Sequence, residues 1–304
     1  MTEVIQDGSI AGNVPAIPAF RPASQEVFTE RSARLQALAR GHAMEDYLRF
    51  AAALTQAQHQ ALAVFPDVPV PPSEALTRCK EHGLPPLSVD GPSRHPAWRD
   101  ALNRIVASLD RVALPPAAAR TLGALASADA TLIEAAASHL LAGAYAELDA
   151  GQAPFIGAAL QVYWTKMAVK LGAEGFGQDG AYGLCPICGS HPVASVVRVG
   201  GAAQGLRYLV CSLCASEWHV VRVKCSACAS TKGISYFGIE GATQAIKAEA
   251  CDECKTYLKI FYLEQDTAME PVADDLATLA LDLLVDEQGY KRVGPNLLIF
   301  LGQA

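Results

Sequence analysis

Eight of the nine cysteines fall into four Cys-x-x-Cys pairs that repeat at a fixed offset along the chain. Adding forty to each position in the first two pairs gives the positions in the last two, so one C-x2-C-x22-C-x2-C module occurs twice in tandem. A tetrahedral thiolate site needs four sulfurs at about 2.3 Å from one ion. The repeat therefore predicts two four-cysteine metal sites. Their expected ligands are Cys185, Cys188, Cys211 and Cys214 in the first repeat, and Cys225, Cys228, Cys251 and Cys254 in the second.

Other groupings and other chemistry for these cysteines remain open on sequence alone. A cross-braced arrangement would join the first pair to the third and the second to the fourth. Redox-active dithiols place a Cys-x-x-Cys at the start of a helix, whose dipole lowers the thiol pKa, whereas these pairs lead into β-rich segments. Iron–sulfur clusters use cysteines at other spacings. Zinc and iron both accept four thiolates in a tetrahedron, so the expected cofactors are two metal ions, iron or zinc.

Residues beside the cysteines support a closed metal site. The segment 185–189 is the turn shared by rubredoxins and zinc ribbons, and Gly189 suits the positive φ that such a turn often needs. His191 and His219 lie near the pairs, but four cysteines per site favour a supporting position for them. Cys79 is unpaired and is expected to be an ordinary half-buried thiol. Four thiolates leave no open position for Lewis-acid hydrolysis.

The charge distribution argues against nucleic-acid binding. The formal net charge is −7, and a basic face is the usual footprint of a nucleic-acid-binding protein. Residues 185–265 contain eight Lys or Arg and six Asp or Glu, and two tetrathiolate centres would reverse that small positive surplus. No apolar stretch reaches the roughly 20 residues of a membrane span. The N-terminus does not resemble a secretory signal, so we expect a cytoplasmic protein without membrane insertion.

Composition and periodicity divide the chain into five segments. Five glycines between Gly172 and Gly183 mark the clearest boundary, where helical periodicity ends and Val-rich runs begin. The expected fold class is α+β: an all-α helical domain, then two tandem rubredoxin-like (zinc-ribbon-like) β modules and a C-terminal helix. The predicted segments are a loose lead-in at 1–24, the helical domain at 25–172, the metal modules at 183–224 and 225–265, and the helix and tail at 270–304.

The elements expected within these segments follow from apolar spacing and turn residues. Helical faces are predicted at 28–38 and 44–65, followed by a short helix capped by Ser73, and helices at 96–109, 116–126, 129–148 and 154–171. Strands are predicted at 193–199, 207–210, 218–223, 235–239 and 257–263. The C-terminal helix, 271–288, is expected to carry an apolar stripe, and its tail, 296–301, is expected to be packed. The stripe comprises Leu276, Leu279, Ala280, Leu283 and Leu284.

The same C-terminal helix carries a row of acidic residues. Asp274, Asp275, Asp282 and Glu287 are predicted to form an acidic face, either solvated or used to dock a partner. The sequence contains no nucleophile–base set, no phosphate-binding glycine loop and no paired catalytic carboxylates. We therefore expect a protein without catalytic residues.

Several segments resemble the bacterial formate dehydrogenase formation accessory proteins, the FdhE family. The resemblance covers most of the chain and is most specific in the C-terminal third. Weaker matches occur at 31–35 and at Tyr47 and Leu48. The segments that carry it are 217–225 (EWHVVRVKC), 248–259 (AEACDECKTYLK), 270–276 (EPVADDL) and 279–284 (LALDLL), with Glu287, Gly289, Tyr290 and Arg292.

The resemblance implies a non-catalytic cytoplasmic assembly factor. Its partner would be the catalytic subunit of formate dehydrogenase, whose maturation or redox state it would support, with iron in both rubredoxin-like sites. On this hypothesis the helical domain and the acidic C-terminal helix contact that subunit. Two alternatives remain: a rubredoxin-like electron-transfer component, and a zinc-ribbon adaptor protein, which the charge balance disfavours.

Overall fold

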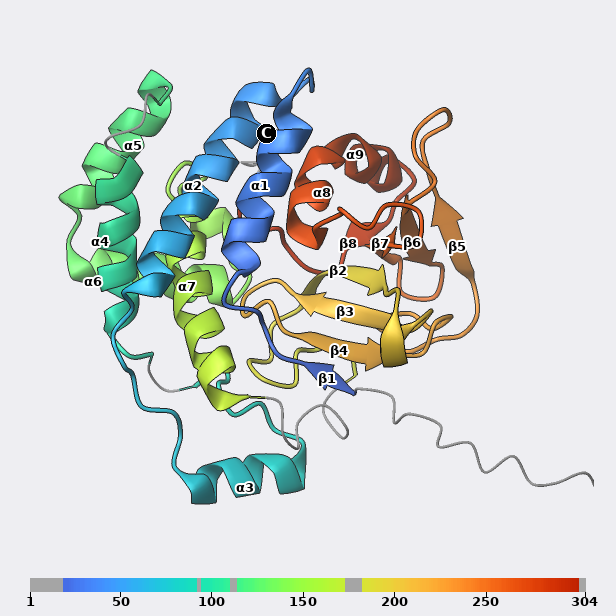
Figure 1. The fold of residues 1–304 in the computed structure, drawn as a ribbon, viewed down its shortest axis with the longest axis horizontal. Coiled ribbons are helices and arrows are strands. Elements are labelled where there is room, and N and C mark those ends of the chain that lie inside the picture. The colour runs from blue at the N-terminus through green and yellow to red at the C-terminus, as the bar shows by residue number, and fades with distance from the viewer. Residues whose placement is uncertain (1–18, 92–93, 110–113, 173–181, 301–304) are drawn as a thin grey trace, which may run out of the picture.

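The computed structural model describes residues 19–91, 94–109, 114–172 and 182–300. Helices from residues 27–171 pack together beside one mixed β-sheet, and two C-terminal helices lie against that sheet (Figure 1). The predicted α+β class is confirmed. Residues 1–18, most of the predicted lead-in, and 173–181, most of the glycine-rich boundary, lie outside the described residues.

The helical part is organised around α7. Nearly every residue of this helix from Ala153 to Ala168 is buried, because α2, α4 and α6 all pack against it. None of the helices in the described ranges is long and apolar enough to cross a membrane. The helices are α1 Val27–Ala39, α2 Glu45–Ala63, α3 Ser73–His82, α4 Ala97–Leu109, α5 Pro116–Ala126, α6 Ala130–Leu141 and α7 Ala153–Leu171, with a short 3₁₀ turn at Tyr145–Glu147.

Two details of the predicted helices are wrong. The helix expected at 129–148 ends at Leu141, because the chain turns at Gly143, whose φ is +73°. Ser73 is the first residue of α3 rather than its cap, which is Pro72. Gly83 ends α3 in the left-handed conformation, with φ 62°.

The two cysteine repeats contribute to one continuous sheet. Its strand order is β1-β4-β3-β2-β7-β6-β5, with β8 beside β7. Each repeat supplies three antiparallel strands, and the two sets join where β2 runs parallel to β7, with Ser195 opposite Ile260. The strands are β1 Phe20–Arg21, β2 Pro192–Val197, β3 Arg207–Cys211, β4 Glu217–Val220, β5 Ile234–Phe237, β6 Ile246–Cys251, β7 Thr256–Tyr262 and β8 Lys291–Arg292.

The sheet contains strands that the sequence did not predict. β1 lies within the expected loose lead-in and pairs with β4, with Phe20 opposite Trp218. β6 alternates Lys247 and Glu249 with alanines, residues with low β-propensity, although it is a mostly buried strand between β7 and β5. The strand expected at 218–223 ends at Val220, and the residues that follow it are exposed.

The C-terminal helix is divided at Thr278 into α8 (Pro271–Ala277) and α9 (Leu279–Glu287). The predicted apolar stripe is wrong in α9, where Leu283 and Leu284 are 59% and 47% exposed, whereas Leu276 of α8 is buried as predicted. Leu281 and Val285 face the core instead. Leu297 and Leu298 of the tail are buried, so the described part of the tail is packed as predicted.

The predicted acidic face does not face solvent at its first two residues. Asp274 and Asp275 are 2% and 0% exposed. Asp274 accepts hydrogen bonds from Arg34 of α1, while Asp275 pairs with Arg292 and with Lys259 of β7. These carboxylates therefore join α8 to the helical part and to the sheet. The hypothesis that they dock a partner is wrong, because the chain's own cations already surround them.

Candidate metal centres

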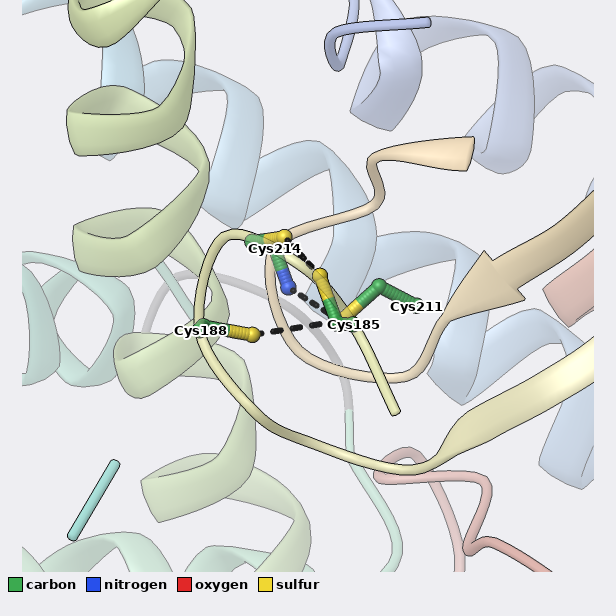
Figure 2. Close-up of side chains that lie close together, drawn as sticks. All are labelled: Cys185, Cys188, Cys211 and Cys214. Carbon is green, nitrogen blue, oxygen red and sulfur yellow. Dashed lines mark hydrogen bonds between the residues drawn. The ribbon is translucent and has the colours of Figure 1, made fainter. Parts of the chain in front are cut away.

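The eight paired cysteines meet in two groups, each formed by the two pairs of one repeat. We call Cys185, Cys188, Cys211 and Cys214 the first cluster, and Cys225, Cys228, Cys251 and Cys254 the second cluster. All ligand atoms within a cluster lie within 4.8 Å of one another. Figure 2 shows the side chains of the first cluster converging from two facing loops. The cross-braced grouping is not formed.

The sulfur spacing fits a tetrahedral ion. Four sulfurs at about 2.3 Å from one centre would lie about 3.8 Å apart. In the first cluster the Sγ atoms of Cys185 and Cys214 are 3.5 Å apart, and those of Cys188 and Cys211 are 3.4 Å apart. In the second cluster the corresponding pairs are separated by 3.6 and 3.7 Å. A disulfide needs about 2.05 Å, so the sulfurs are too far apart to be bonded to one another. Their spacing could hold a zinc ion or an iron ion equally well.

Each Cys-x-x-Cys turn, or knuckle, is followed by one residue in the left-handed conformation. Only the first of these residues is a glycine, as the sequence suggested for that position. The others carry a side chain at a φ that L-residues rarely adopt. The four residues and their φ angles are Gly189 at 78°, Ala215 at 57°, Ala229 at 62° and Lys255 at 54°.

A serine or threonine closes each knuckle. It lies five residues after the first cysteine, giving the sequences CPICGS, CSLCAS, CSACAS and CDECKT. In the first three knuckles the N–H of the first cysteine donates to the carbonyl of that serine, at 2.8 to 2.9 Å. In the fourth, Cys251 is paired with Thr256 in the antiparallel ladder. The serine or threonine at this position recurs in all four knuckles, so it is a sequence signal in addition to the cysteine spacing.

Backbone amides point at sulfur in both clusters. The amides of Leu213 and Cys214 donate to Cys211 Sγ at 3.4 and 3.3 Å, and those of Ala227 and Cys228 donate to Cys225 Sγ at 3.4 and 3.5 Å. Such donors favour the charged thiolate. Burial acts in the opposite direction and raises the pKa of Cys185 and Cys211 well above the ordinary value. A cation at the centre would offset the unfavourable burial of the thiolate charge, because the cysteines bind a metal only in their deprotonated form.

The helical part of the chain supplies contacts to the first cluster that the sequence did not reveal. Gln161 of α7 donates to the carbonyl of Ser212 at 2.8 Å, and the loop after α3 hydrogen-bonds along the first knuckle. In the sequence, a glutamine within an otherwise apolar helical stretch hints at such a contact, and the structure buries this side chain. Among the described residues neither cluster includes a histidine. His191 is exposed, His219 packs on Tyr208, and Cys79 is half-buried as expected.

Comparison with protein families matches almost the whole chain to three consecutive models. The model described as FdhE, N-terminal, matches residues 17–177. The FdhE central domain matches 184–222, and the FdhE C-terminal domain matches 223–299. The central and C-terminal models each contain one cysteine repeat, and the boundary between them falls between the repeats.

Individual relatives are similar over their full length. The chain is 43% identical to a protein named Protein FdhE homolog from Edwardsiella ictaluri, covering 95% of this chain and 93% of the relative. It is also 43% identical to the homolog from Stutzerimonas stutzeri, covering 98% of both. The crystal structure of the FdhE protein from Pseudomonas aeruginosa is similar, with a TM-score of 0.86 and 40% identity, over 94% of this chain and 100% of that one.

Proposed function

Because the chain belongs to the FdhE family, we propose that it is an accessory protein for the maturation of formate dehydrogenase. In this role it binds the catalytic subunit of that enzyme in the cytoplasm and supports its maturation or redox state. It performs no catalysis of its own. The observation that carries the proposal is the family match over nearly the whole chain, together with both cysteine clusters.

The clusters support an accessory role rather than an enzymatic one. In each cluster all four positions around a tetrahedral ion would be filled by cysteine sulfur, so no position is left for a substrate. Zinc or iron bound there would supply a closed tetrahedral centre, and iron would in addition exchange one electron. The residues that would hold the ions are the eight cysteines of the two clusters.

The test is whether the chain retains the catalytic subunit and restores formate oxidation. The tagged full chain should co-purify with that subunit from cells that lack their own accessory protein, and formate oxidation in extracts should return. Cys188→Ser removes one ligand of the first cluster and should abolish restoration. Cys79→Ser is the matched control, because Cys79 belongs to neither cluster. No retained subunit from a fully metal-loaded chain would count heavily against the proposal.

Optical and nucleic-acid measurements separate this function from the two alternatives. Ferric tetrathiolate absorbs visible light and zinc does not, so an absorption spectrum with elemental analysis identifies the ion. An electron-transfer component would show a reversible one-electron couple. A zinc-ribbon adaptor acting on nucleic acid would show affinity that falls steeply with salt.

A further inference from the structure

The two clusters have the same ligands but differ in their access to solvent. In the first cluster Cys185, Cys188, Cys211 and Cys214 are only 2%, 0%, 1% and 0% exposed. In the second cluster two cysteines are buried, Cys254 is half-buried and Cys228 is exposed. Cys228 is the residue that corresponds to Cys188 after the forty-residue offset. A fully buried ligand, Cys188, and the most exposed ligand, Cys228, thus occupy the same position in the two repeats.

The first cluster is buried because the helical part of the chain covers both its knuckles. Leu87 and Val89 donate backbone hydrogen bonds to the carbonyls of Ile187 and Cys188, at 2.8 and 2.9 Å. On the other knuckle, Gln161 donates to Ser212 at 2.8 Å. To open this cluster, these three hydrogen bonds must break, and the helices must also separate from the sheet.

The equivalent positions of the second cluster face solvent. Ala227 corresponds to Ile187, and Asp252 corresponds to Ser212; both are exposed. One side of this cluster is covered, since Gly183 lies so close to Ser226 that a Cβ on the glycine would be 2.0 Å from the Ser226 carbonyl oxygen. Cys225, next to that contact, is accordingly 4% exposed. The open side of the cluster is therefore the side of Cys228.

We propose that the second cluster is the exchange site of the protein, where an incoming thiolate or chelating ligand reaches the metal ion by displacing Cys228, while the first cluster retains its ion as part of the fold. In this exchange one donor atom of the incoming ligand binds as the Cys228 thiolate leaves, so the ion keeps four ligands. When the incoming ligand is a thiolate, the charge of the centre is also unchanged. The inference rests on metal binding at both clusters, which the proposed function includes, but not on contact with the dehydrogenase.

The experiment uses the full chain in a Cys79→Ser background, loaded with two zinc ions, and follows their release to an excess of a colorimetric chelator. We expect two phases of one ion each. The slow phase should be on the order of 100-fold slower, because three additional buried hydrogen bonds must open. Cys228→Ser should remove the fast phase only, and the matched change Cys188→Ser should remove the slow phase.

A second measurement needs no ligand substitution. Limiting iodoacetamide on the zinc-loaded Cys79→Ser protein, which lacks the one cysteine outside the clusters, should label Cys228 first, as mapped by mass spectrometry, with loss of one ion. A single release phase for both ions, first labelling of the first cluster, or failure of the chain to load two ions would each overturn the proposal. Because these measurements use the isolated chain, a protein that retains the dehydrogenase subunit but releases both ions together would refute this inference alone.

Discussion

Arg207 in the first cysteine repeat and Glu249 in the second form a buried ion pair, with Nη2 and Oε1 2.7 Å apart. Their side chains are 0% and 3% exposed, and the contact is ionic rather than a well-aligned hydrogen bond. Arg207 also donates to the carbonyls of Arg222 and Lys224, at 3.2 Å each. One side chain therefore fixes both the second repeat and the segment that leads into it.

Replacing Glu249 by Gln should destabilise the protein strongly. The change leaves Arg207 buried without its counter-charge, which typically costs about 3–5 kcal/mol. The free energy of unfolding of the zinc-loaded chain, measured in urea, gives this loss. Asp286→Asn is the control, because Asp286 and its partner Lys291 are exposed, and such pairs contribute at most about 1 kcal/mol. Equal losses of unfolding free energy in the two variants would contradict the assignment of Arg207 and Glu249 as a stabilising ion pair.

Gly157 in the second turn of α7 should not tolerate a methyl group. A Cβ at this position would lie 2.9 Å from the carbonyl oxygen of Leu297 in the C-terminal tail. Gly157→Ala should therefore displace the tail and reduce the free energy of unfolding by about 1–3 kcal/mol. Gly123→Ala in α5 meets nothing within 4 Å. That control should stabilise the protein by up to about 1 kcal/mol. If both substitutions changed the free energy of unfolding in the same direction, the close approach of Gly157 to the Leu297 carbonyl would be refuted.

The left-handed residues of the knuckles should respond oppositely to glycine and alanine. Ala229→Gly relieves a strained φ of 62° and should stabilise the protein by about 1 kcal/mol. Gly189→Ala introduces the same strain and should destabilise it by about 1 kcal/mol. A Cβ at Gly189 would be 3.4 Å from Pro85, an ordinary contact, so the loss is a backbone effect. Thermal denaturation of the zinc-loaded variants measures both changes.

Asp275 should contribute stability that is lost in acid. Burial disfavours its charged form, but Arg292 and Lys259 outweigh burial and hold the pKa of this carboxyl below its ordinary value. Its stabilisation is therefore complete above the unfolded pKa of about 3.9 and decreases as pH falls from there toward the lower folded pKa. The difference in unfolding free energy between the wild type and Asp275→Asn should accordingly be large at pH 7 and shrink below about pH 4. Metal loss in acid affects both proteins and largely cancels in this difference. If the difference did not change with pH, the charge of Asp275 would not be the source of its stabilisation.

The grouping of the cysteines and most helices could be predicted from sequence, because both depend on local spacing. Two cysteines separated by two residues present their sulfurs to the same side of a turn, and the forty-residue offset pairs knuckles within one repeat. Helices such as α4 and α7 follow from apolar residues at helical intervals. The strand β6 could not be predicted, because its alternating alanines and charged residues have low β-propensity. The burial of Asp274 could not be predicted, because its partner Arg34 comes from a distant part of the chain.

The sequence by itself determined that two sets of four sulfurs would meet, because identical knuckles recur at identical spacing. The tertiary structure alone decided that the two clusters differ. Leu87, Val89 and Gln161 cover the first cluster, although they lie far from its cysteines in the chain, and the corresponding face of the second cluster is left open at Cys228. Solvent access depends on which segments pack together, and a local repeat carries no information about that.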